Sequence, residues 1–358
     1  MATMKSLTIN PDASSTLTEI PIPTPGPHEV LVKVVVAGSN PKDWKLPQWY
    51  NKPANTGDDM AGIVEAVGSE VYEFKKGDRV MAYRYWLNPY GTYAEYAIAY
   101  DFMTVKIPEK VSFEEAATIP LAALTAVVGL YETLRLPQPW IPATKPIPLV
   151  VYGAATAVGA FAIKLAKLSN IHPIIGVVGR GKDFAETLID RSKGDELVDY
   201  RDGNEAVVKG IHAALKKNGF EKVDHVFDTV SEHGSAVDAA AVLSETGKIA
   251  GVLSLSMDEK TKVLPKDLNW ELTLVSWTYE TEWKEGSEER KQGAIVAGRE
   301  MGFLYMRWMV RGLDEGWFKG HPYEIVEGGL NGVSGALKKL KDGKSSAVKF
   351  VYRVEDTK

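Results

Sequence analysis

The sequence predicts an α/β protein in which an antiparallel β-barrel domain is joined to a domain with a doubly wound parallel sheet. Three observations support this prediction. The first third of the chain is rich in short strands and turns, and from Leu149 onward strand and helix patterns alternate. The chain of 358 residues, 45% of them hydrophobic, is long enough for two packed domains.

Short strands separated by turns occupy the N-terminal third. The segment "EVLVKVVVAG" predicts a strand that ends at Gly38, and "AGIVEAVGSEVYEFKKGDRVMAY" predicts two strands around turns. The segment "GTYAEYAIAY" alternates with a period of two. Several short strands at this spacing, with few helices between them, favour a small antiparallel barrel.

Helical patterns begin after Ser112 with "SFEEAATIPLAALTAVVGLYETL", where Glu114 and Glu115 suit the positive end of a helix dipole. A proline-rich connector, "RLPQPWIPATKPIPL", follows and is expected to be irregular. Near the C-terminus, "REMGFLYMRWMVRGLDEG" predicts a helix and "AVKFVYRV" a closing strand.

Repeated strand–helix units begin at "PLVVYG" and continue to "GKIAGVLSL". Such a repeat predicts a parallel sheet covered by helices on both faces. Its first turn is "GAATAVG", from Gly153 to Gly159. In a doubly wound sheet this turn binds the pyrophosphate of a dinucleotide, because backbone N–H groups and the helix dipole attract the anion.

The glycine pattern of this turn is degraded, since Thr156 and Ala157 stand where a second glycine would help. The turn alone is therefore equally compatible with simple strand-to-helix packing. The strand–helix repeat that follows favours dinucleotide binding. After the second strand, in "GVVGRGKDF", Arg180 and Lys182 precede the first acid, Asp183. Two cations suit a 2′-phosphate and favour NADPH; the alternative is that both are solvated at a helix start.

Composition narrows the function further. The net charge of −5 gives no basic field for nucleic acid, and the absence of cysteine excludes disulfides and thiolate ligands. The six histidines show no HExxH or close HxH pair, so no metal site is expected. The N-terminus lacks a signal-peptide pattern and no run approaches the length of a membrane span, so we expect a soluble cytoplasmic protein without a membrane partner.

Together these features resemble the medium-chain dehydrogenase/reductase superfamily over nearly the whole chain. The motifs are "PGPHEVLVKVVVAGSNPKDWK", "GDDMAGIVEAVGSEVYEFKKGDRV", the turn at Gly153, and "KVDHVFDTV" followed by "GKIAGVL". The resemblance implies a GroES-like catalytic domain of residues 1–124 and 280–358. It implies a Rossmann dinucleotide-binding domain of residues 125–279.

Departures from the zinc-dependent branch are equally informative. Those members carry Cys where this chain has Asn40, and Gly-His-Glu where it has Gly57-Asp58-Asp59. The chain therefore resembles the zinc-free branch, with quinone and enoyl reductases. Its proline-rich connector is similar to that of the fungal trans-acting enoyl reductases that partner polyketide synthases.

The resemblance assigns cofactor contacts along the chain. The segment from Lys42 to Lys45 would lie beside the nicotinamide, and the turn at Gly153 would hold the pyrophosphate. The loops after the later strands would hold the adenosine end and contact the nicotinamide. The implied contacts are Lys42, Asp43, Trp44, Lys45, Thr125, Ala154, Ala155, Thr156, Ala157, Val158, Arg180, Lys182, Tyr200, Val252, Leu253 and Ser346.

Hydride transfer to a conjugated alkene or quinone needs no metal, because the acceptor carbon is already electrophilic. The candidate catalytic residues are Lys45, Thr125, Asn40 and Tyr50. Lys45 would donate to the developing oxyanion or only to the cofactor. Tyr50 would be a proton donor or, with Trp44 and Trp49, an aromatic wall, with water as the proton source.

Other polar and apolar residues have simpler interpretations. Asp43 is expected to cap a helix rather than to act as a general acid. Met60, Trp277 and Tyr279 would line the acceptor pocket or belong to the core.

Two functions from different classes remain at this point. The first is an NADPH-dependent reductase of activated C=C bonds, in enoyl thioesters and enones, or of quinones. Its acceptor would be a small molecule or an acyl chain bound to the carrier protein of a polyketide synthase, and it would act as a monomer or homodimer. The second is an NADPH-binding structural protein of the same fold with little catalytic activity.

Overall fold

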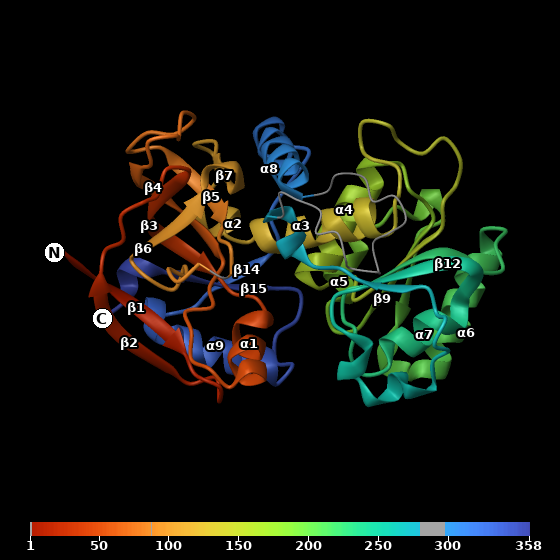
Figure 1. Cartoon of the computed structure of the whole chain (residues 1–358). Helices are drawn as coiled ribbons and strands as arrows, with labels where there is room; N and C mark the ends of the chain where they lie inside the picture. The colour runs from red at the N-terminus through yellow and green to blue at the C-terminus, as the bar shows by residue number, and fades with distance from the viewer. Residues whose placement is uncertain (1, 87, 280–297) are drawn as a thin grey trace. The chain divides into compact units, whose positions relative to one another are not determined.

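The computed structural model describes residues 2–86, 88–279 and 298–358, which fold into two compact units (Figure 1). The antiparallel unit comprises, of the described residues, 2–86, 88–124, 278–279 and 298–358. The parallel unit comprises residues 125–277. Residues 280–297, which the sequence assigned to the return of the chain to the first domain, lie outside the described residues.

The antiparallel unit is built on a seven-stranded sheet in the order β14-β15-β3-β4-β5-β7, with β6 paired to β3. Its pairs are antiparallel except for β14 with β15, and β1 and β2 form a separate two-stranded sheet. The strands are β1 Thr3–Ile9, β2 Ser15–Pro21, β3 Glu29–Gly38, β4 Asp59–Val67, β5 Arg79–Tyr83, β6 Tyr96–Tyr100, β7 Thr104–Lys106, β14 Tyr323–Ile325 and β15 Lys349–Arg353.

Among the described residues, four helices belong to the antiparallel unit and a fifth begins there. They are α1 Lys42–Tyr50, α2 Phe113–Ala116, α8 Gly298–Glu315, α9 Val333–Lys341, and α3 Pro120–Val127, which runs into the parallel unit. The alternating apolar residues of β3 and β4 pack with α9 and β15 in one core. Met60 is fully buried in this core, so it belongs to the core, the second of the two roles expected for it.

The segment after Ser112 with helical patterns forms two helices, α2 and α3. Ser112 caps α2 as expected, because its hydroxyl accepts from the backbone N–H of Glu115 at 3.1 Å. The chain then leaves the helix and restarts at Pro120, whose ring has no N–H to continue the earlier turn. A π-helical stretch, Val128–Thr133, follows α3 directly.

This helical segment also corrects the expectation that no run is apolar enough to span a membrane. Residues Phe113–Thr133 have the length and hydropathy of a membrane-spanning helix, but 83% of the apolar window is buried within the protein. Burial of this kind is typical of the central helix of a protein core.

The parallel unit has a six-stranded sheet in the order β10-β9-β8-β11-β12-β13, with every pair parallel. The order reverses between β8 and β11, which is where ligands bind in open α/β sheets. The strands are β8 Leu149–Tyr152, β9 Ile174–Val178, β10 Glu196–Asp199, β11 Val223–Asp228, β12 Leu243–Gly251 and β13 Trp270–Leu272.

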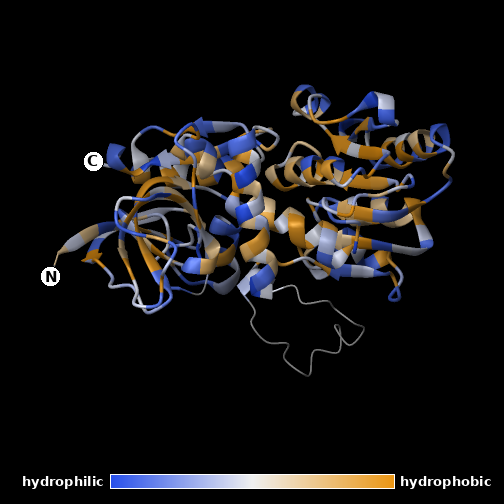
Figure 2. Ribbon diagram, turned by 90° about the horizontal axis from the view of Figure 1, so that it is seen from above, coloured by the Kyte–Doolittle hydropathy of each residue, from blue (hydrophilic) through white to orange (hydrophobic). Residues whose placement is uncertain are grey.

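Helices cover this sheet as the sequence predicts. Residues of α6 and α7 pack on the face formed by Val150, Ile175 and Val226, while neighbouring residues of the same strands are buried toward the opposite face. Figure 2 shows hydrophobic residues concentrated along these strands. The helices are α4 Ala157–Leu168, α5 Lys182–Glu186, α6 Asn204–Lys217 and α7 Ser235–Val242.

Candidate functional site

The turn between β8 and α4 is shaped for a close approach of backbone to a ligand. Gly153 adopts a φ of +86°, and the amides of Gly153 and Ala154 both donate to the carbonyl of Val177. A Cβ on Gly159 would lie 2.2 Å from the carbonyl oxygen of Gly153, so only glycine fits there. Gly153 and Gly159 are thus the two glycines that this geometry requires.

Thr156 replaces the missing glycine with a helix cap. Its hydroxyl accepts from the amide of Gly159 at 2.9 Å and lies 3.0 Å from the hydroxyl of Thr229, in the loop after β11. Ala157 and Val158 contribute the first two amides of α4, for which a helix offers no internal acceptor. Amides at a helix N-terminus, beside the point where the strand order reverses, fit a pyrophosphate.

The loop after β9 carries the two predicted phosphate-binding cations. Arg180 is exposed, and Lys182 is the exposed first residue of α5. A Cβ on Gly179 would lie 2.5 Å from the ring of Tyr200, so this ring lies directly against the same loop. The structure therefore brings Tyr200, from the start of the loop after β10, against the loop that carries Gly179 and Arg180.

The loops after β11 and β12 are tied to each other by Asp228. The carboxylate of Asp228 accepts from the amides of Val230 and Ser231 at 3.0 and 2.8 Å and from the hydroxyl of Ser235 at 2.7 Å. The Ser231 hydroxyl in turn accepts from the amide of Val252 at 2.9 Å. Burial raises the pKa of Asp228 to about 6, against the lowering effect of these donors. The pattern in the sequence named Val252 and Leu253 but missed Asp228 and Ser231, which hold that loop.

In the antiparallel unit, α1 presents the predicted catalytic segment. Lys45 is only 6% exposed, and its ammonium lies 5.4 Å from the ring centroid of Trp44 and 5.9 Å from that of Trp49. Tyr50, at the end of α1, is 65% exposed. The rings favour a cation beside them, so they hold the Lys45 ammonium in a defined place.

The sequence predicted that Asp43 caps a helix, but the N-cap of α1 is Pro41, and no side chain caps this helix; Asp43 lies in its first turn and binds the loop before it. Its fully buried carboxylate accepts from the amide of Asn40 at 2.8 Å and from the hydroxyl of Tyr93 at 2.6 Å. Burial raises the pKa of Asp43, and Lys42, at 3.0 Å, opposes that rise. Its enclosed carboxylate supports the loop, and the expected contact of Asp43 with a cofactor stays a prediction.

Lys42 is engaged in the same way. Its ammonium lies 2.5 Å from the carboxylate of Asp58, which is also bound by Nε and Nη2 of the buried Arg84 at 3.1 and 2.9 Å. A direct cofactor contact of Lys42 would have to compete with this ion pair. The sequence named Asp58 only as a departure from the zinc-dependent pattern and did not identify Arg84.

Asn40 lies beside a second buried ion pair. Its side-chain amide donates to Asp59 at 2.8 Å, and its carbonyl oxygen accepts from Lys349 at 3.2 Å. Lys349 is itself 2.5 Å from Asp59. No local sequence signal identifies Lys349 as a partner, because it lies 309 residues from Asn40 along the chain.

The remaining predicted residues lie on other elements. Thr125 is buried on α3, in the parallel unit. Ser346 is exposed in the loop before β15, next to Ala347, whose φ is +56°. Trp277 and Tyr279 lie on a short 3₁₀ segment, where the ring of Tyr279 packs against that of Tyr85 at a tilt, with ring centroids 4.7 Å apart.

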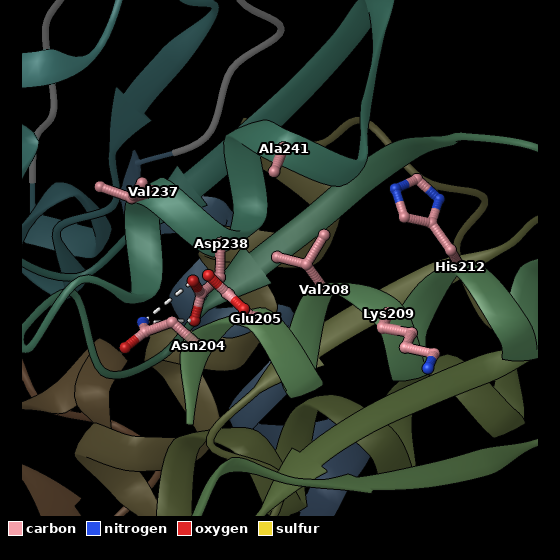
Figure 3. A pocket seen from close by; sticks show the side chains of 8 residues that line it. All are labelled: Asn204, Glu205, Val208, Lys209, His212, Val237, Asp238 and Ala241. Carbon is pink, nitrogen blue, oxygen red and sulfur yellow. Dashed lines mark hydrogen bonds between the residues drawn. The ribbon is translucent and has the colours of Figure 1, made fainter. Parts of the chain in front are cut away.

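A shallow hollow between α6 and α7 contains none of the predicted site residues (Figure 3). Two of its lining side chains are bound to each other, because the Asn204 amide donates to Asp238, which also accepts from the Tyr152 hydroxyl. Among the described residues, no group of three or more His, Asp or Glu side chains is arranged to hold a metal ion.

Comparison with known proteins adds to this geometry. Residues 26–109 match the alcohol dehydrogenase GroES-like domain family. The chain is 40% identical over 336 residues to the trans-enoyl reductase fsr4 of Gibberella fujikuroi, covering 92% of this chain and 93% of that protein. It is 32% identical to the trans-enoyl reductase resD of Aspergillus sclerotiorum, covering 96% and 98%.

A solved structure with the same fold is that of the quinone oxidoreductase from Coxiella burnetii. Its TM-score is 0.71 at 22% identity, with 99% of this chain and 100% of that chain covered. At this identity the likeness concerns the fold alone.

Proposed function

Because the chain belongs to the trans-enoyl reductases of the medium-chain dehydrogenase/reductase superfamily, we propose that it reduces enoyl thioesters with NADPH and without a metal. Enzymes of this family are oxidoreductases, and those of the superfamily use a nicotinamide cofactor. The observation that carries the choice of NADPH is the pair Arg180 and Lys182 beside Gly179 and Tyr200, with no acid before Asp183.

The residues of the parallel unit would bind and orient the cofactor. Gly153 and Gly159 permit the close approach, and the first amides of α4 receive the pyrophosphate charge. Arg180 and Lys182 pair with a 2′-phosphate, and the Ser231–Val252 hydrogen bond orders the loop beside the nicotinamide. When bound, the reduced nicotinamide supplies a hydride for the β-carbon of the enoyl group.

Residues of α1 and α3 would act on the acceptor. Lys45 donates to the thioester oxygen as negative charge develops there, and Thr125 orients the nicotinamide end. The α-carbon then takes a proton from Tyr50 or from water, which completes the addition of two hydrogens across the double bond. The exposure of Tyr50 is compatible with either source.

We also propose that the acceptor is an acyl chain carried by a polyketide synthase, as the trans-acting character of the relatives suggests. The enclosed, tryptophan-flanked Lys45 suits a thioester oxygen at the end of an extended chain better than a small polar ketone. A small free enone is the second acceptor class.

The experiment is an assay of NADPH oxidation with enoyl thioesters of short pantetheine analogues, enones and quinones, followed by product mass. We expect enoyl thioesters to be reduced with the largest kcat/KM, and the product to gain two mass units. Binding of NADPH without oxidation by any acceptor would favour the structural-protein alternative. Equal binding of NADH and NADPH would contradict the cofactor proposal.

A further inference from the structure

Lys349 is a cation enclosed in the antiparallel unit. Its side chain is only 3% exposed, and its ammonium lies 2.5 Å from Asp59, 3.2 Å from the carbonyl oxygen of Asn40 and 3.3 Å from the carbonyl of Thr118. The three donors of an ammonium are thereby matched by three acceptors from three separate segments.

The carboxylate of Asp59, the negative partner of Lys349, is bonded to the same segments. One carboxylate oxygen accepts from Lys349 and from the Asn40 side chain, and the other accepts from the amide of Leu121 at 2.7 Å. Leu121 is the second residue of α3, so Asp59 caps the N-terminus of that helix. A single buried carboxylate therefore connects the loop before α1, the start of α3 and the start of β15.

Both proposed reactive segments begin at this connection. Thr125 lies one helical turn beyond Leu121, on the same side of α3. The backbone amide of Asn40 donates to Asp43, and Lys45 follows on the first turns of α1. The Lys349–Asp59 pair is thus linked to α3 through Leu121 and to the loop before α1 through Asn40.

The pair is poorly explained by stability alone. Replacing a buried ion pair by neutral residues is often neutral or stabilising, whereas removing one partner is strongly destabilising. The benefit of keeping both charges is then geometric, because several directional bonds converge on two side chains.

We propose that Lys349 and Asp59 are positioning residues for the reduction, acting through Asn40 and α3 on Lys45 and Thr125. This inference rests on the proposed function. Asn40, one of the candidate catalytic residues, is the bridge between the ion pair and α1, because both ends of its amide are bound within the protein.

The test is a double-mutant cycle of Lys349→Met, Asp59→Asn and the two combined. Each single change leaves a buried charge without its partner and lowers the melting temperature. The double variant removes both charges and recovers most of that loss. We expect its single-turnover rate of NADPH oxidation, at saturating enoyl thioester, to stay roughly 10- to 100-fold below the original. Its affinity for NADPH should change less than about threefold.

The matched control is the double variant Arg353→Met/Glu114→Gln, which removes an ion pair of 2.7 Å from the same strand β15 to α2. That variant should keep the original rate. If the rate of the Lys349→Met/Asp59→Asn variant recovers together with its melting temperature, the pair is merely structural and the inference is wrong.

Amide hydrogen exchange gives a readout that needs no substrate. We expect the backbone amides of residues 40–45 and 121–125 to exchange at least about tenfold faster in the double variant. The amides of the β-strands should exchange at the same rate as in the unaltered protein. If the unaltered protein reduces no enoyl thioester, the proposed function fails. The positioning role is tested separately by hydrogen exchange. If both segments of the double variant exchange as slowly as in the unaltered protein, the positioning role is wrong.

Discussion

The β8–α4 turn and the Lys349–Asp59 connection are formed by different chemical groups, the first by backbone and the second by charged side chains. The turn uses backbone amides, a helix N-terminus and two glycines within seven residues of sequence. The connection uses charged side chains from segments up to 309 residues apart. The turn keeps its shape only if no side chain is added at its glycines. The ion pair keeps its geometry only if both charged side chains are present.

The largest effect should come from adding atoms to the turn. The change Gly159→Ala places a methyl group 2.2 Å from the carbonyl oxygen of Gly153, a fixed backbone atom. We expect a loss of roughly 1–3 kcal/mol or more in the free energy of unfolding, and loss of measurable NADPH binding. Chemical denaturation and cofactor titration measure both.

The control for that change is Gly335→Ala. Gly335 lies inside α9, and a Cβ added there would meet no atom within 4 Å, so alanine should stabilise the protein by up to about 1 kcal/mol. Unaltered cofactor binding by Gly159→Ala would refute the view that the backbone of this turn forms the pyrophosphate site.

A second effect contrasts two buried carboxylates. Asp59 is paired with a cation, whereas Asp228 is held by two amides and a hydroxyl, and burial raises its pKa to about 6. The folded protein therefore binds this proton more tightly than the unfolded chain. The corresponding stability is fully present below about pH 4 and is lost as the pH rises through 6, up to about 3 kcal/mol.

The change Asp228→Asn tests this directly. An amide oxygen can still accept from Val230 and Ser231, and the amide nitrogen can donate to Ser235. We expect the melting temperature of the variant to vary less between pH 4 and 7 than that of the original protein. Parallel pH profiles of the two proteins would mean that Asp228 does not cause the dependence.

The third effect concerns Lys45, whose ammonium is placed by the rings of Trp44 and Trp49. Lys45→Met should lower the single-turnover rate by about 100-fold, because the donor to the developing charge is lost, while the protein remains folded. Lys52→Met, an exposed lysine just beyond the end of α1, is the matched control and should keep the rate. Equal rates for the two variants would remove Lys45 from the proposed mechanism.

The smallest effect is expected at the exposed end of the cofactor site. Arg180→Ala should raise the Kd for NADPH about tenfold or more, since a charge-assisted contact is lost, and leave the Kd for NADH unchanged. Fluorescence titration with both cofactors measures this difference. A similar loss for both cofactors would indicate that Arg180 shapes the loop rather than reading the phosphate.

Much of the parallel unit could be predicted, because its signals are local. Strand and helix periods, the cap at Thr156 and the cations at 180 and 182 each lie within a few residues of the element they define. The start of α3 at Pro120 shows the limit: proline allows a new helix to begin there, but the cap of this helix is Asp59, from the distant strand β4.

The sequence by itself determined the order of the elements, the glycine-dependent turn, the absence of cysteine ligands and the resemblance that led to the family. These follow from periodicity, backbone geometry and residue chemistry, which act over short stretches. Only the tertiary structure decided that Asp43 binds Asn40 and Tyr93, that Arg84 and Lys42 neutralise Asp58, and that Asn40 lies between Lys349 and Asp59. Such pairings depend on how antiparallel strands bring distant segments together, and a buried charge keeps its partner only where that packing places one.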